Sequence, residues 1–498
     1  MSPTHEPLKP LFFTDEVGKD REHKKQLIID MITSRTNCSS DFDEIKSIDR
    51  ALKRGNELCV TTISGGVTNF SYRVTVVGED APETALYVKL FFPYALWGTD
   101  KKVHYDVNRG ANEFKLMRHL KKILGDDAPV ATPYICTHVE ELIIFVTSWA
   151  PADEQWANQF IDGVVDRRII PKLANCLATI NLTPFEGEFN PEFNEEVRPT
   201  MLGMLDLTRQ TVFEHLASKN APADDCIAYL RQIGQEKFFF MMDNLWAKYS
   251  ARDCINHSDS HVFNVLVESK PPSKSDQQFG DDGSMILCDW EMAMAGPHGR
   301  DVGIFQAWPI ACSFFHTAQG HKTAAYIIIE RIFELWDEYA KSMIERGDKD
   351  EAFLMETYRT SLGFTAKYLF IANYLLGMQF EFLPTDGLSE EIIAKAKAAI
   401  GEVGIKVMEY GFGEKELGLS LEELRARYRS LVTEKIESLA AEASKYGAQP
   451  THTSILRETE QRVSDAGMIE NVVRRASNAG KPAIYDKQPL REMIDEER

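Results

Sequence analysis

The sequence predicts an α+β protein in which a small β-rich part precedes a larger, mainly helical part. Between residues 57 and 147, short segments alternate apolar and polar residues, as half-buried strands do. After Trp149-Ala150-Pro151 the apolar residues recur at helical spacing, and this pattern continues to about residue 445. The chain of 498 residues with 44% hydrophobic content can supply a buried core for both parts.

The first part is expected to contain five strands and one helix. The expected strands are Glu57–Ile63, Asn69–Val77, Ala85–Phe91, Tyr134–His138 and Leu142–Thr147. A helix from about Asn108 to Leu124 separates the third strand from the fourth, because its apolar residues recur with helical period. We therefore expect residues 1–44 to form a polar tail or one peripheral helix, and residues 45–148 to form the small domain.

The second part is expected to be helical with one β interlude. The expected helices are Ile169–Asn181, Met201–His215, Ala223–Tyr249, Thr323–Glu345, Phe353–Met378 and Glu390–Tyr410. The segments Val265–Glu268 and Met285–Asp289 flank a loop rich in Pro, Ser, Asp and Gly, which indicates a hairpin. Ser420 and Glu423 form a capping box that should begin a charged helix. Residues 149–415 then form the large domain, and residues 416–498 a terminal helix with a polar tail.

Charge and cysteine usage exclude several classes of protein. The chain has 76 acidic and 56 basic residues, so its formal charge of -20 repels nucleic acid and leaves no basic stripe for it. No apolar run approaches the roughly 20 residues that span a bilayer. The eight cysteines are dispersed without a CxxC pair, which is typical of reduced thiols in the cytoplasm. A homodimer is left open.

The stretch His257-Ser258-Asp259-Ser260-His261-Val262-Phe263-Asn264 comes directly before the first hairpin strand. An aspartate on a short loop can orient or deprotonate a substrate hydroxyl. An asparagine five residues later can reach back to a metal ion beside that aspartate. Asp259 is therefore the candidate catalytic base, His257 a second candidate in the same loop, and Asn264 a candidate metal ligand.

The second hairpin strand ends at Asp289-Trp290-Glu291. Two carboxylates at positions i and i+2 suit a Mg²⁺ ion that bridges nucleotide phosphates. Asp289 and Glu291 are therefore candidate metal ligands. The order HxDxxxxN, strand, turn, strand, DxE is that of the catalytic and metal loops of kinase-like phosphotransferases.

The small domain contains candidate nucleotide-binding residues. Between its first two strands, Ser64, Gly65, Gly66 and the nearby Asn69 form a turn whose glycines allow close approach of phosphate oxygens. Lys89 lies among apolar strand neighbours and needs an anionic partner, which Glu113 on the following helix can supply. Each motif alone also has a purely structural reading, but their order along the chain favours function.

Two other classes of function compete with this interpretation. His257, Asp259 and His261 could instead be ligands in a metallohydrolase, since closely spaced His and Asp residues bind zinc or iron. That reading leaves Lys89 and the Gly-Gly turn unexplained. A catalytically inactive binding protein with a kinase fold is the second alternative, but it would be expected to lose the base or a metal ligand.

These residues resemble the aminoglycoside phosphotransferase, choline/ethanolamine kinase and methylthioribose kinase superfamily. Residues 63–74 (ISGGVTNFSYRV) resemble its nucleotide loop, HSDSHVFNVLV its catalytic loop, and residues 288–303 (CDWEMAMAGPHGRDVG) its metal loop and the aspartate after it. The resemblance covers residues 45–412. It implies a two-lobed protein-kinase-like fold, with a small β-rich N-lobe and a large helical C-lobe, that uses ATP and Mg²⁺ to phosphorylate a small-molecule hydroxyl.

The resemblance also implies residue roles. Asp259 would be the base, Asn264, Asp289 and Glu291 would hold metal, and Asp301 would support the catalytic loop. The backbone at Thr147, Ser148 and Trp149 would meet adenine. Ser258 departs from the family's usual Gly or Asn, and the paired arginines of methylthioribose kinases are missing after Lys367-Tyr368. A sugar-like acceptor and an amino-alcohol both remain open, and Trp308, Trp336, Tyr368 and Tyr374 are candidates for a cage around a quaternary ammonium group.

Overall fold

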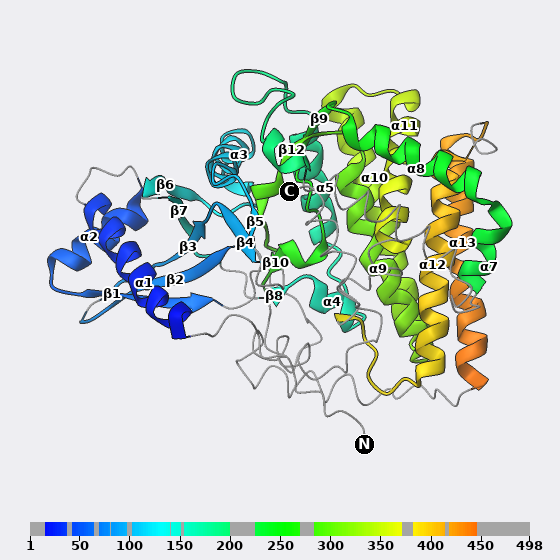
Figure 1. Ribbon diagram of the computed structural model, residues 1–498, viewed down its shortest axis with the longest axis horizontal. Helices are drawn as coiled ribbons and strands as arrows, with labels where there is room; N and C mark the ends of the chain where they lie inside the picture. The colour runs from blue at the N-terminus through cyan, green and yellow to red at the C-terminus, as the bar shows by residue number, and fades with distance from the viewer. Residues whose placement is uncertain are drawn as a thin grey trace.

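The structure is a computed structural model of two lobes (Figure 1). It describes residues 15–36, 42–63, 69–79, 81–96, 102–139, 141–150, 154–199, 225–268, 283–370, 382–413 and 418–445. The small lobe holds an antiparallel sheet with several helices, and the large lobe is mainly helical, which confirms the predicted α+β two-lobed class. Of the predicted elements, the helix Met201–His215 and the loop at 271–282 lie outside the described residues.

The central sheet of the small lobe has the strand order β1-β2-β3-β7-β6. Its strands are β1 (Glu57–Ile63), β2 (Phe70–Val77), β3 (Ala85–Phe91), β6 (Pro133–Val139) and β7 (Leu142–Ser148). The helix α3 (Arg109–Leu124) follows β3 after a small hairpin of β4 (Tyr94–Leu96) and β5 (Lys102–His104). All five predicted strands and the predicted helix are therefore confirmed, whereas the β4–β5 hairpin was not anticipated.

The two faces of this sheet belong to different cores. Leu86, Val88 and Leu90 of β3 face the helices α1 (Asp15–Thr36) and α2 (Asp43–Lys53), whose buried isoleucines complete one apolar cluster. The alternate residue Phe91 packs instead with α3 and the large lobe, because successive side chains of a strand point to opposite faces. In the described residues before the first strand, 15–36 and 42–56, two helices pack on the sheet, where the sequence led us to expect a tail or one peripheral helix.

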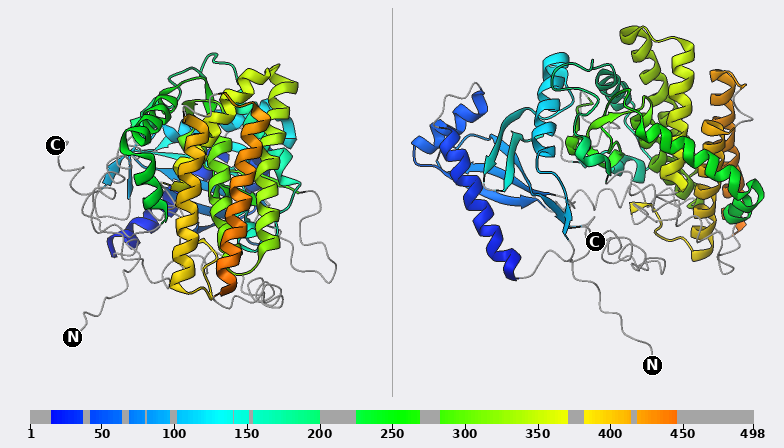
Figure 2. Two further views of the ribbon diagram at one scale, coloured as in Figure 1. Left: turned by 90° about the vertical axis from the view of Figure 1, so that its right-hand side faces the viewer. Right: turned by 45° about the horizontal axis from the view of Figure 1, so that its top comes forward.

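The large lobe is mainly helical, and its longer helices are α5 (Ile169–Asn181), α7 (Asp225–Ile233), α8 (Gln235–Ser250), α9 (Arg300–Ala318), α10 (Lys322–Gly347), α11 (Glu351–Ala366), α12 (Glu390–Phe412) and α13 (Leu421–Lys445). Of these, helices α9 to α13 run side by side (Figure 2). The expected capping box is present, because the Glu423 amide donates to Ser420 Oγ while Glu423 Oε2 accepts from the Ser420 amide. The predicted single helix over Ala223–Tyr249 is wrong in one respect: Gly234, at φ +83°, divides it into two.

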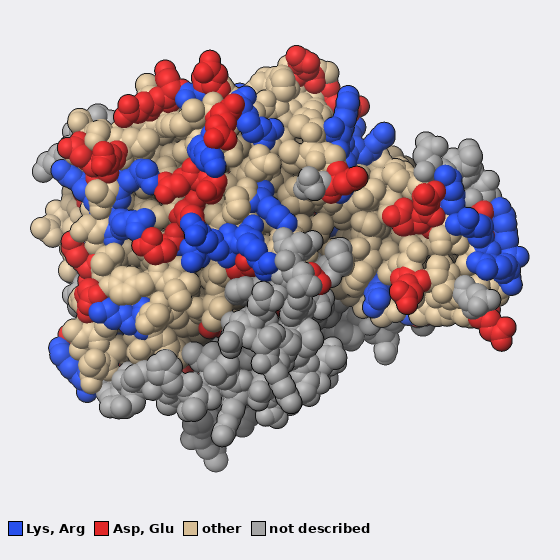
Figure 3. Space-filling view, turned by 180° about the vertical axis from the view of Figure 1, so that it is seen from behind, with Lys and Arg blue, Asp and Glu red and all other residues tan. Residues whose placement is uncertain are grey.

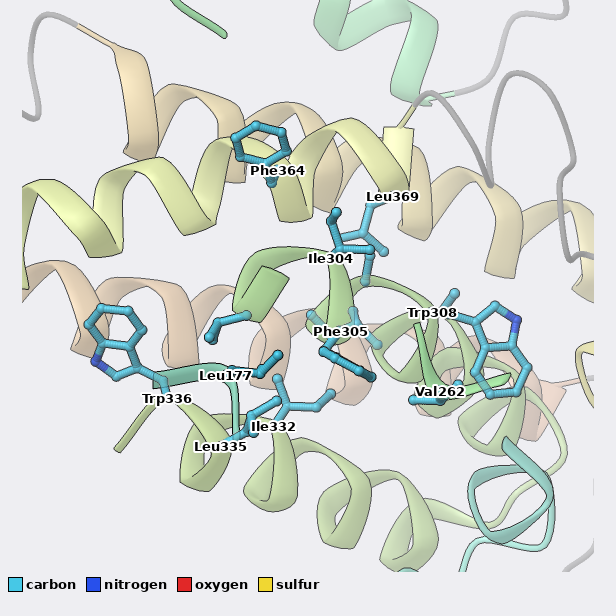
Figure 4. Packing of buried hydrophobic residues seen from close by; sticks show 14 of the residues in the cluster. Leu177, Val262, Ile304, Phe305, Trp308, Ile332, Leu335, Trp336, Phe364 and Leu369 are labelled. Carbon is cyan, nitrogen blue, oxygen red and sulfur yellow. The ribbon is translucent and has the colours of Figure 1, made fainter. Parts of the chain in front are cut away.

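Helix α9 is a long helix that sequence periodicity missed. Each of its residues is buried, including Pro309 in its interior, so it has no polar face to produce an amphipathic pattern. Figure 4 shows Ile304, Phe305 and Trp308 of α9 in the core, with Leu177 of α5 and Ile332 of α10 nearby. The helix begins immediately after the metal loop, so this buried rod fixes the position of Asp301 at its first turn.

Short strands and short helical turns flank the loops that contain the candidate site residues of the large lobe. β9 (Cys254–Asn256) pairs with β12 (Met294–Gly296), and β10 (Val265–Val267) pairs with both β11 (Met285–Leu287) and β8 (Glu154–Gln155). The short helical elements are α4 (Ala157–Ile161), η1 (Gly125–Asp127), η2 (Glu195–Val197), η3 (Val262–Asn264) and η4 (Trp290–Met292). The predicted hairpin is therefore confirmed, and its two ends carry η3 and η4.

Positive and negative side chains are interspersed on the face seen in Figure 3, with no stripe of one sign. Among the described helices, none combines the length and apolar character that crossing a bilayer requires.

Candidate active site

The catalytic-loop candidate, residues 257–264, leaves β9 and is held by one carboxylate of α9. Asp301 accepts hydrogen bonds from the amides of His257 (2.8 Å) and Ser258 (2.9 Å) and from Ser260 Oγ (2.6 Å). Asp301 is only 1% exposed, so these three bonds are not in competition with bulk water. The loop is thus shaped by the fold itself, and Asp301 occupies the supporting position that the resemblance implied.

The backbone of this loop explains the departure at Ser258. Its φ is +74°, in the left-handed region that Gly and Asn adopt most readily. The Oγ atom of Ser258 is buried and has no hydrogen-bond partner. Ser258 therefore occupies a position suited to the family's Gly or Asn at some cost in backbone strain.

The ring of His257 is used entirely for shaping the loop. Its Nε2 lies 2.9 Å from the Cys288 carbonyl, and its Nδ1 accepts from the Asp259 amide at 3.3 Å. Burial lowers the pKa of His257, which keeps the ring neutral and able to donate at one nitrogen while accepting at the other. His257 therefore links the catalytic loop to the metal loop through the main chain.

Asp259 projects into a partly open position, with 31% of its side chain exposed. Asn264 Nδ2 donates to its carbonyl at 2.9 Å and to its Oδ2 at 3.2 Å, and His261 Nε2 lies 3.5 Å from its Oδ1. Burial alone would raise the pKa of Asp259, but His261, His257 and the Asn264 hydrogen bond together hold it below its usual range. The same ion pair raises the pKa of His261 against the effect of burial.

Asp289 lies just beyond β11, next to Asn264 across the hairpin. The Cys288 amide donates to the Asn264 carbonyl at 2.9 Å, which brings the two loops together. Asp289 has φ +66°, a left-handed backbone conformation that ends the extended strand. Its side chain is 35% exposed. Asn194, another non-glycine residue with positive φ, donates to the carbonyls of Glu291 and Ala293 in the same turn.

Lys89 joins the small lobe to this metal loop. Its Nζ lies 3.1 Å from Glu113 Oε2 on α3 and 2.5 Å from Asp289 Oδ1, with only 6% of its side chain exposed. Burial opposes the charge of Lys89, but the surrounding carboxylates raise its pKa well above the usual value. Burial raises the pKa of Glu113 to about 7, although Lys89 acts in the opposite direction. The expected ion pair between a lysine on a strand and a glutamate on a helix is present in the structure.

Glu291 is placed differently from the metal-ligand role expected of it. It is 2% exposed, and its Oε2 accepts from Asn69 Nδ2 (2.7 Å) and Arg109 Nε (3.0 Å). Arg109 Nη2 also donates to Asn69 Oδ1 at 2.9 Å, which closes a triangle of three buried side chains. The amide of Asn69, expected at the nucleotide, is therefore engaged with Glu291 and Arg109.

Arg109 is the site residue that the sequence reasoning missed. It is fully buried at the first position of α3, four residues before Glu113, so both side chains lie on the same helix face. That spacing of a cation and a carboxylate next to the predicted Lys89 partner was the available signal. Its guanidinium also donates to the carbonyls of Phe92 and Asp106, which satisfies its remaining nitrogen.

Around Lys89 the carboxyl groups outnumber the cations. Glu113, Asp289 and Glu291 face the two cations Lys89 and Arg109, and burial raises the pKa of both Glu113 and Asp289. Asp289 is the most exposed of these carboxyl groups, and the main chain of Asn264 lies across the hairpin from it. Carboxylate and amide oxygens are ligands that fit a hard divalent cation such as Mg²⁺.

The other candidate residues lie at the junction of the lobes or outside the description. Thr147 and Ser148 end β7, and the amide of Trp149 directly after it donates to the Ala85 carbonyl at 3.2 Å. Ser64, Gly65 and Gly66 lie outside the described residues. Figure 4 shows Trp308 and Trp336 packed within the core, and each is at most 2% exposed. These two tryptophans cannot line an ammonium cage, and Tyr374 lies outside the described residues.

Comparisons with known proteins identify the family. The sequence model of the phosphotransferase enzyme family matches residues 60–327. A spectinomycin phosphotransferase solved with ADP and spectinomycin is 14% identical, with 80% of this chain and 98% of that chain covered and a TM-score of 0.36. An aminoglycoside phosphotransferase from Alicyclobacillus acidocaldarius is 11% identical, with 76% and 92% covered and a TM-score of 0.39.

An aminoglycoside-3'-phosphotransferase of type VIII is 15% identical, with 64% of this chain and 99% of that chain covered and a TM-score of 0.31. The search of curated proteins gives no match. The family match includes the catalytic and metal loops and extends over more than half of the 498 residues. The chain therefore belongs to the phosphotransferase enzyme family, and it is a kinase-type phosphotransferase with the two-lobed protein-kinase-like fold.

Proposed function

We propose that this enzyme transfers the γ-phosphoryl group of ATP to a hydroxyl of a small molecule, with Asp259 as the catalytic base. One observation carries the proposal: Lys89, Glu113 and Asp289 come from a strand, a helix and a loop far apart in the sequence, yet meet around one ammonium group. A buried lysine held between two carboxylates at the junction of two lobes is suited to receive phosphate oxygens when nucleotide enters.

Lys89 is the proposed phosphate ligand and Glu113 its support. With phosphate present, the ammonium group can neutralise phosphate charge while Glu113 keeps it oriented. Arg109, Glu291 and Asn69 form the buried base of this arrangement. We therefore propose that Glu291 is a structural anion that fixes Arg109 and Asn69 rather than a metal ligand, because its Oε2 already accepts two hydrogen bonds.

Asn264 and Asp289 are the proposed ligands of Mg²⁺. When bound, Mg²⁺ would neutralise phosphate charge and orient the transferred group. Asp289 would then exchange its bond to Lys89 for the ion, which leaves Lys89 free for phosphate. The excess of carboxyl groups over cations around Lys89 supports a divalent cation at this place.

Asp259 is the proposed base because it is ionised, partly exposed and rigidly held. Its low pKa keeps Asp259 ionised, so that it can accept a hydrogen bond from the acceptor hydroxyl and orient it. So weak a base would accept the proton only late, as the oxygen–phosphorus bond forms and the bond from the γ-phosphorus to ADP breaks. His257 is a positioning residue, since both of its ring nitrogens bond to the main chain. The retention of Asp259, Asn264, Asp289 and Lys89 argues against an inactive binding protein.

The acceptor is proposed to be a polyhydroxyl compound of sugar-like character. The alternative, a choline-like amino-alcohol, depended on an aromatic cage to which Trp308 and Trp336 do not contribute. We further propose that the enzyme works in the cytoplasm, because the described Cys59, Cys136, Cys176, Cys254, Cys288 and Cys312 are all free thiols.

The test is an ATP-consumption screen of the purified protein with Mg²⁺ against sugars, sugar derivatives, amino-alcohols and aminoglycosides. Acceptor-dependent release of ADP that requires Mg²⁺ supports the proposal. Phosphorylated product should be detected by mass spectrometry in the same reactions. Binding of ATP and Mg²⁺ without turnover on any acceptor would favour the inactive scaffold instead.

A further inference from the structure

Beside the catalytic loop, two buried cations meet at a single phenol. Lys367, at the end of α11, donates from Nζ to Tyr249 Oη at 3.1 Å, and Arg300, the first residue of α9, donates from Nη2 to the same oxygen at 3.3 Å. Arg300 is fully buried and Lys367 is 4% exposed. Three segments far apart in the sequence therefore bring two positive charges to one phenol. Burial raises the pKa of Tyr249, but Lys367 and Arg300 together hold it below its usual value.

This cluster adjoins the catalytic base. Arg300 Nη2 also donates to the carbonyl of Ser258, the residue directly before Asp259, at 3.3 Å. Tyr368, next to Lys367 in the chain, is partly buried, with its ring centroid 4.6 Å from Lys367 Nζ. Burial raises the pKa of Tyr368, and Tyr249 and the charge of Asp259 act in the same direction.

The two cations have no carboxylate partner among the described residues. Arg300 Nε and Nη1 are both buried without a hydrogen-bond acceptor. The nearest carboxylate in the chain, Asp301, uses its oxygens on the amides and hydroxyl of the catalytic loop. Burial of two cations around one hydroxyl is costly, and anions or strong acceptors normally offset it.

A third buried cation in the same region, Arg198, has protein partners that compensate its charge. Arg198 donates to the carbonyls of Tyr249 and Ala295 and forms an ion pair with Glu195 at 2.7 Å. All of its charge is thus accounted for by the protein. Arg300 and Lys367 lack such a partner, although they lie closer to the catalytic loop.

We propose that Lys367, Arg300 and Tyr249 form a subsite for an acidic group of the acceptor, so that the substrate is a hydroxyl compound carrying a carboxylate or a phosphate. This inference rests on the proposed phosphotransfer and narrows its acceptor. An acidic group would receive the ammonium and guanidinium donors while the hydroxyl of the same molecule reached Asp259. A cationic acceptor would instead be repelled by both side chains.

The test uses acceptors that share one carbon skeleton and differ in one group: the neutral sugar alcohol, the sugar acid, the sugar phosphate and the amino sugar. For the wild-type enzyme we expect kcat/KM to be at least about 10-fold higher for an acidic compound than for its neutral counterpart. Comparison of kcat/KM for the sugar acid and the sugar phosphate shows which acidic group the subsite binds. A preference for the amine or the neutral compound would overturn the inference and leave phosphotransfer intact.

Variants then assign the preference to the cluster. Lys367→Met should raise KM for the acidic acceptor by about 10- to 100-fold, because a charged hydrogen-bond donor is lost, and leave KM for ATP unchanged. Lys367→Arg should restore part of the affinity. Lys322→Met, which removes a surface lysine that also lies over a tyrosine ring, is the matched control and should change neither constant.

Tyr249→Phe gives a second, independent variant if Lys367→Met fails to fold. It removes the oxygen that accepts from both cations and keeps the ring, so thermal unfolding should stay cooperative. The ratio of kcat/KM for the acidic acceptor to kcat/KM for the neutral acceptor should change. Equal losses on acidic and neutral acceptors in both variants would mean that the cluster is structural only, contrary to the inference. Absence of turnover with every acceptor would overturn the proposed function itself, and the inference with it.

Discussion

The catalytic loop and the Lys89 cluster lie on either side of the same site but are held by different forces. The loop at 257–264 is fixed by directional hydrogen bonds to Asp301 and by the ring of His257, all within the large lobe. The Lys89 cluster is held by ion pairs between the small lobe and the metal loop. Hydrogen bonds to one buried carboxylate define a single geometry, whereas ion pairs can be exchanged for those of an arriving ligand.

This difference indicates a division of labour. The loop should be ready before nucleotide binds, because its bonds to Asp301 and through the ring of His257 involve no group that ATP or Mg²⁺ would use. The Lys89 cluster should change when nucleotide binds, because Asp289 and Lys89 are each other's partners in its absence. Changes to the loop should thus affect the chemical step, and changes to the cluster should affect nucleotide binding.

The largest expected effect is that of Asp259→Asn. The amide nearly preserves size but cannot accept the proton, so we expect kcat to fall by roughly 10²-fold or more with the fold and ATP·Mg affinity retained. Asp289→Asn should instead weaken ATP·Mg binding, because it removes charge from the proposed metal ligand. Steady-state kinetics beside calorimetric titration separate the two. Turnover at the wild-type rate by Asp259→Asn would remove the base from the proposed mechanism.

Lys89→Met should weaken the use of ATP by about 10- to 100-fold in kcat/KM for ATP, because a charged donor to phosphate is lost. The fold should survive, since Glu113, with a pKa of about 7, can take up a proton when the lysine is absent. Lys53→Met is the control, because Lys53 is an exposed lysine with its own ion pair to Asp49. Kinetics with varied ATP decide the matter, and an unchanged KM and kcat would exclude Lys89 from the site.

His261→Gln tests how the loop keeps its base ionised. In the wild type, His261 lowers the pKa of Asp259, so the base stays charged well into the acidic range. Without the imidazolium, burial is less well opposed and the pKa of Asp259 should rise. The acidic limb of the kcat against pH profile should therefore move to higher pH. A profile that coincides with that of the wild type would show that His261 does not govern the ionisation of Asp259.

The smallest expected effect is a gain of stability from Ser258→Gly. Glycine adopts φ +74° without the clash that costs a non-glycine residue about 1 kcal/mol, and the change removes a buried hydroxyl that has no partner. We expect the free energy of unfolding to rise by about 1 kcal/mol after the entropy cost of glycine. Asp348→Gly, at an exposed residue with φ +49°, tests the backbone contribution alone. Calorimetric unfolding measures both, and a loss of stability in Ser258→Gly would contradict the strain argument.

The sequence by itself determined the local elements and the polarity of the site. Alternation of side chains gave all five strands of the small sheet, and the spacing of Asp259, Asn264 and Asp289 around a hairpin gave the order of the two loops. These features are readable because strand period, turn residues and loop motifs are local properties of the chain. The pairing of Lys89 with Glu113 was also within reach, since a lysine among apolar strand residues requires an anion.

The tertiary structure alone decided what surrounds these residues. Helix α9 is buried on all sides, so no periodic pattern marked it, although it supplies Asp301 to the loop. Whether Glu291 faces a metal or a guanidinium depends on Arg109, 182 residues away in the chain. The meeting of Lys367, Arg300 and Tyr249 likewise arises from three helices packed together. Charge partners and burial are set by contacts between distant segments, and no local pattern encodes them.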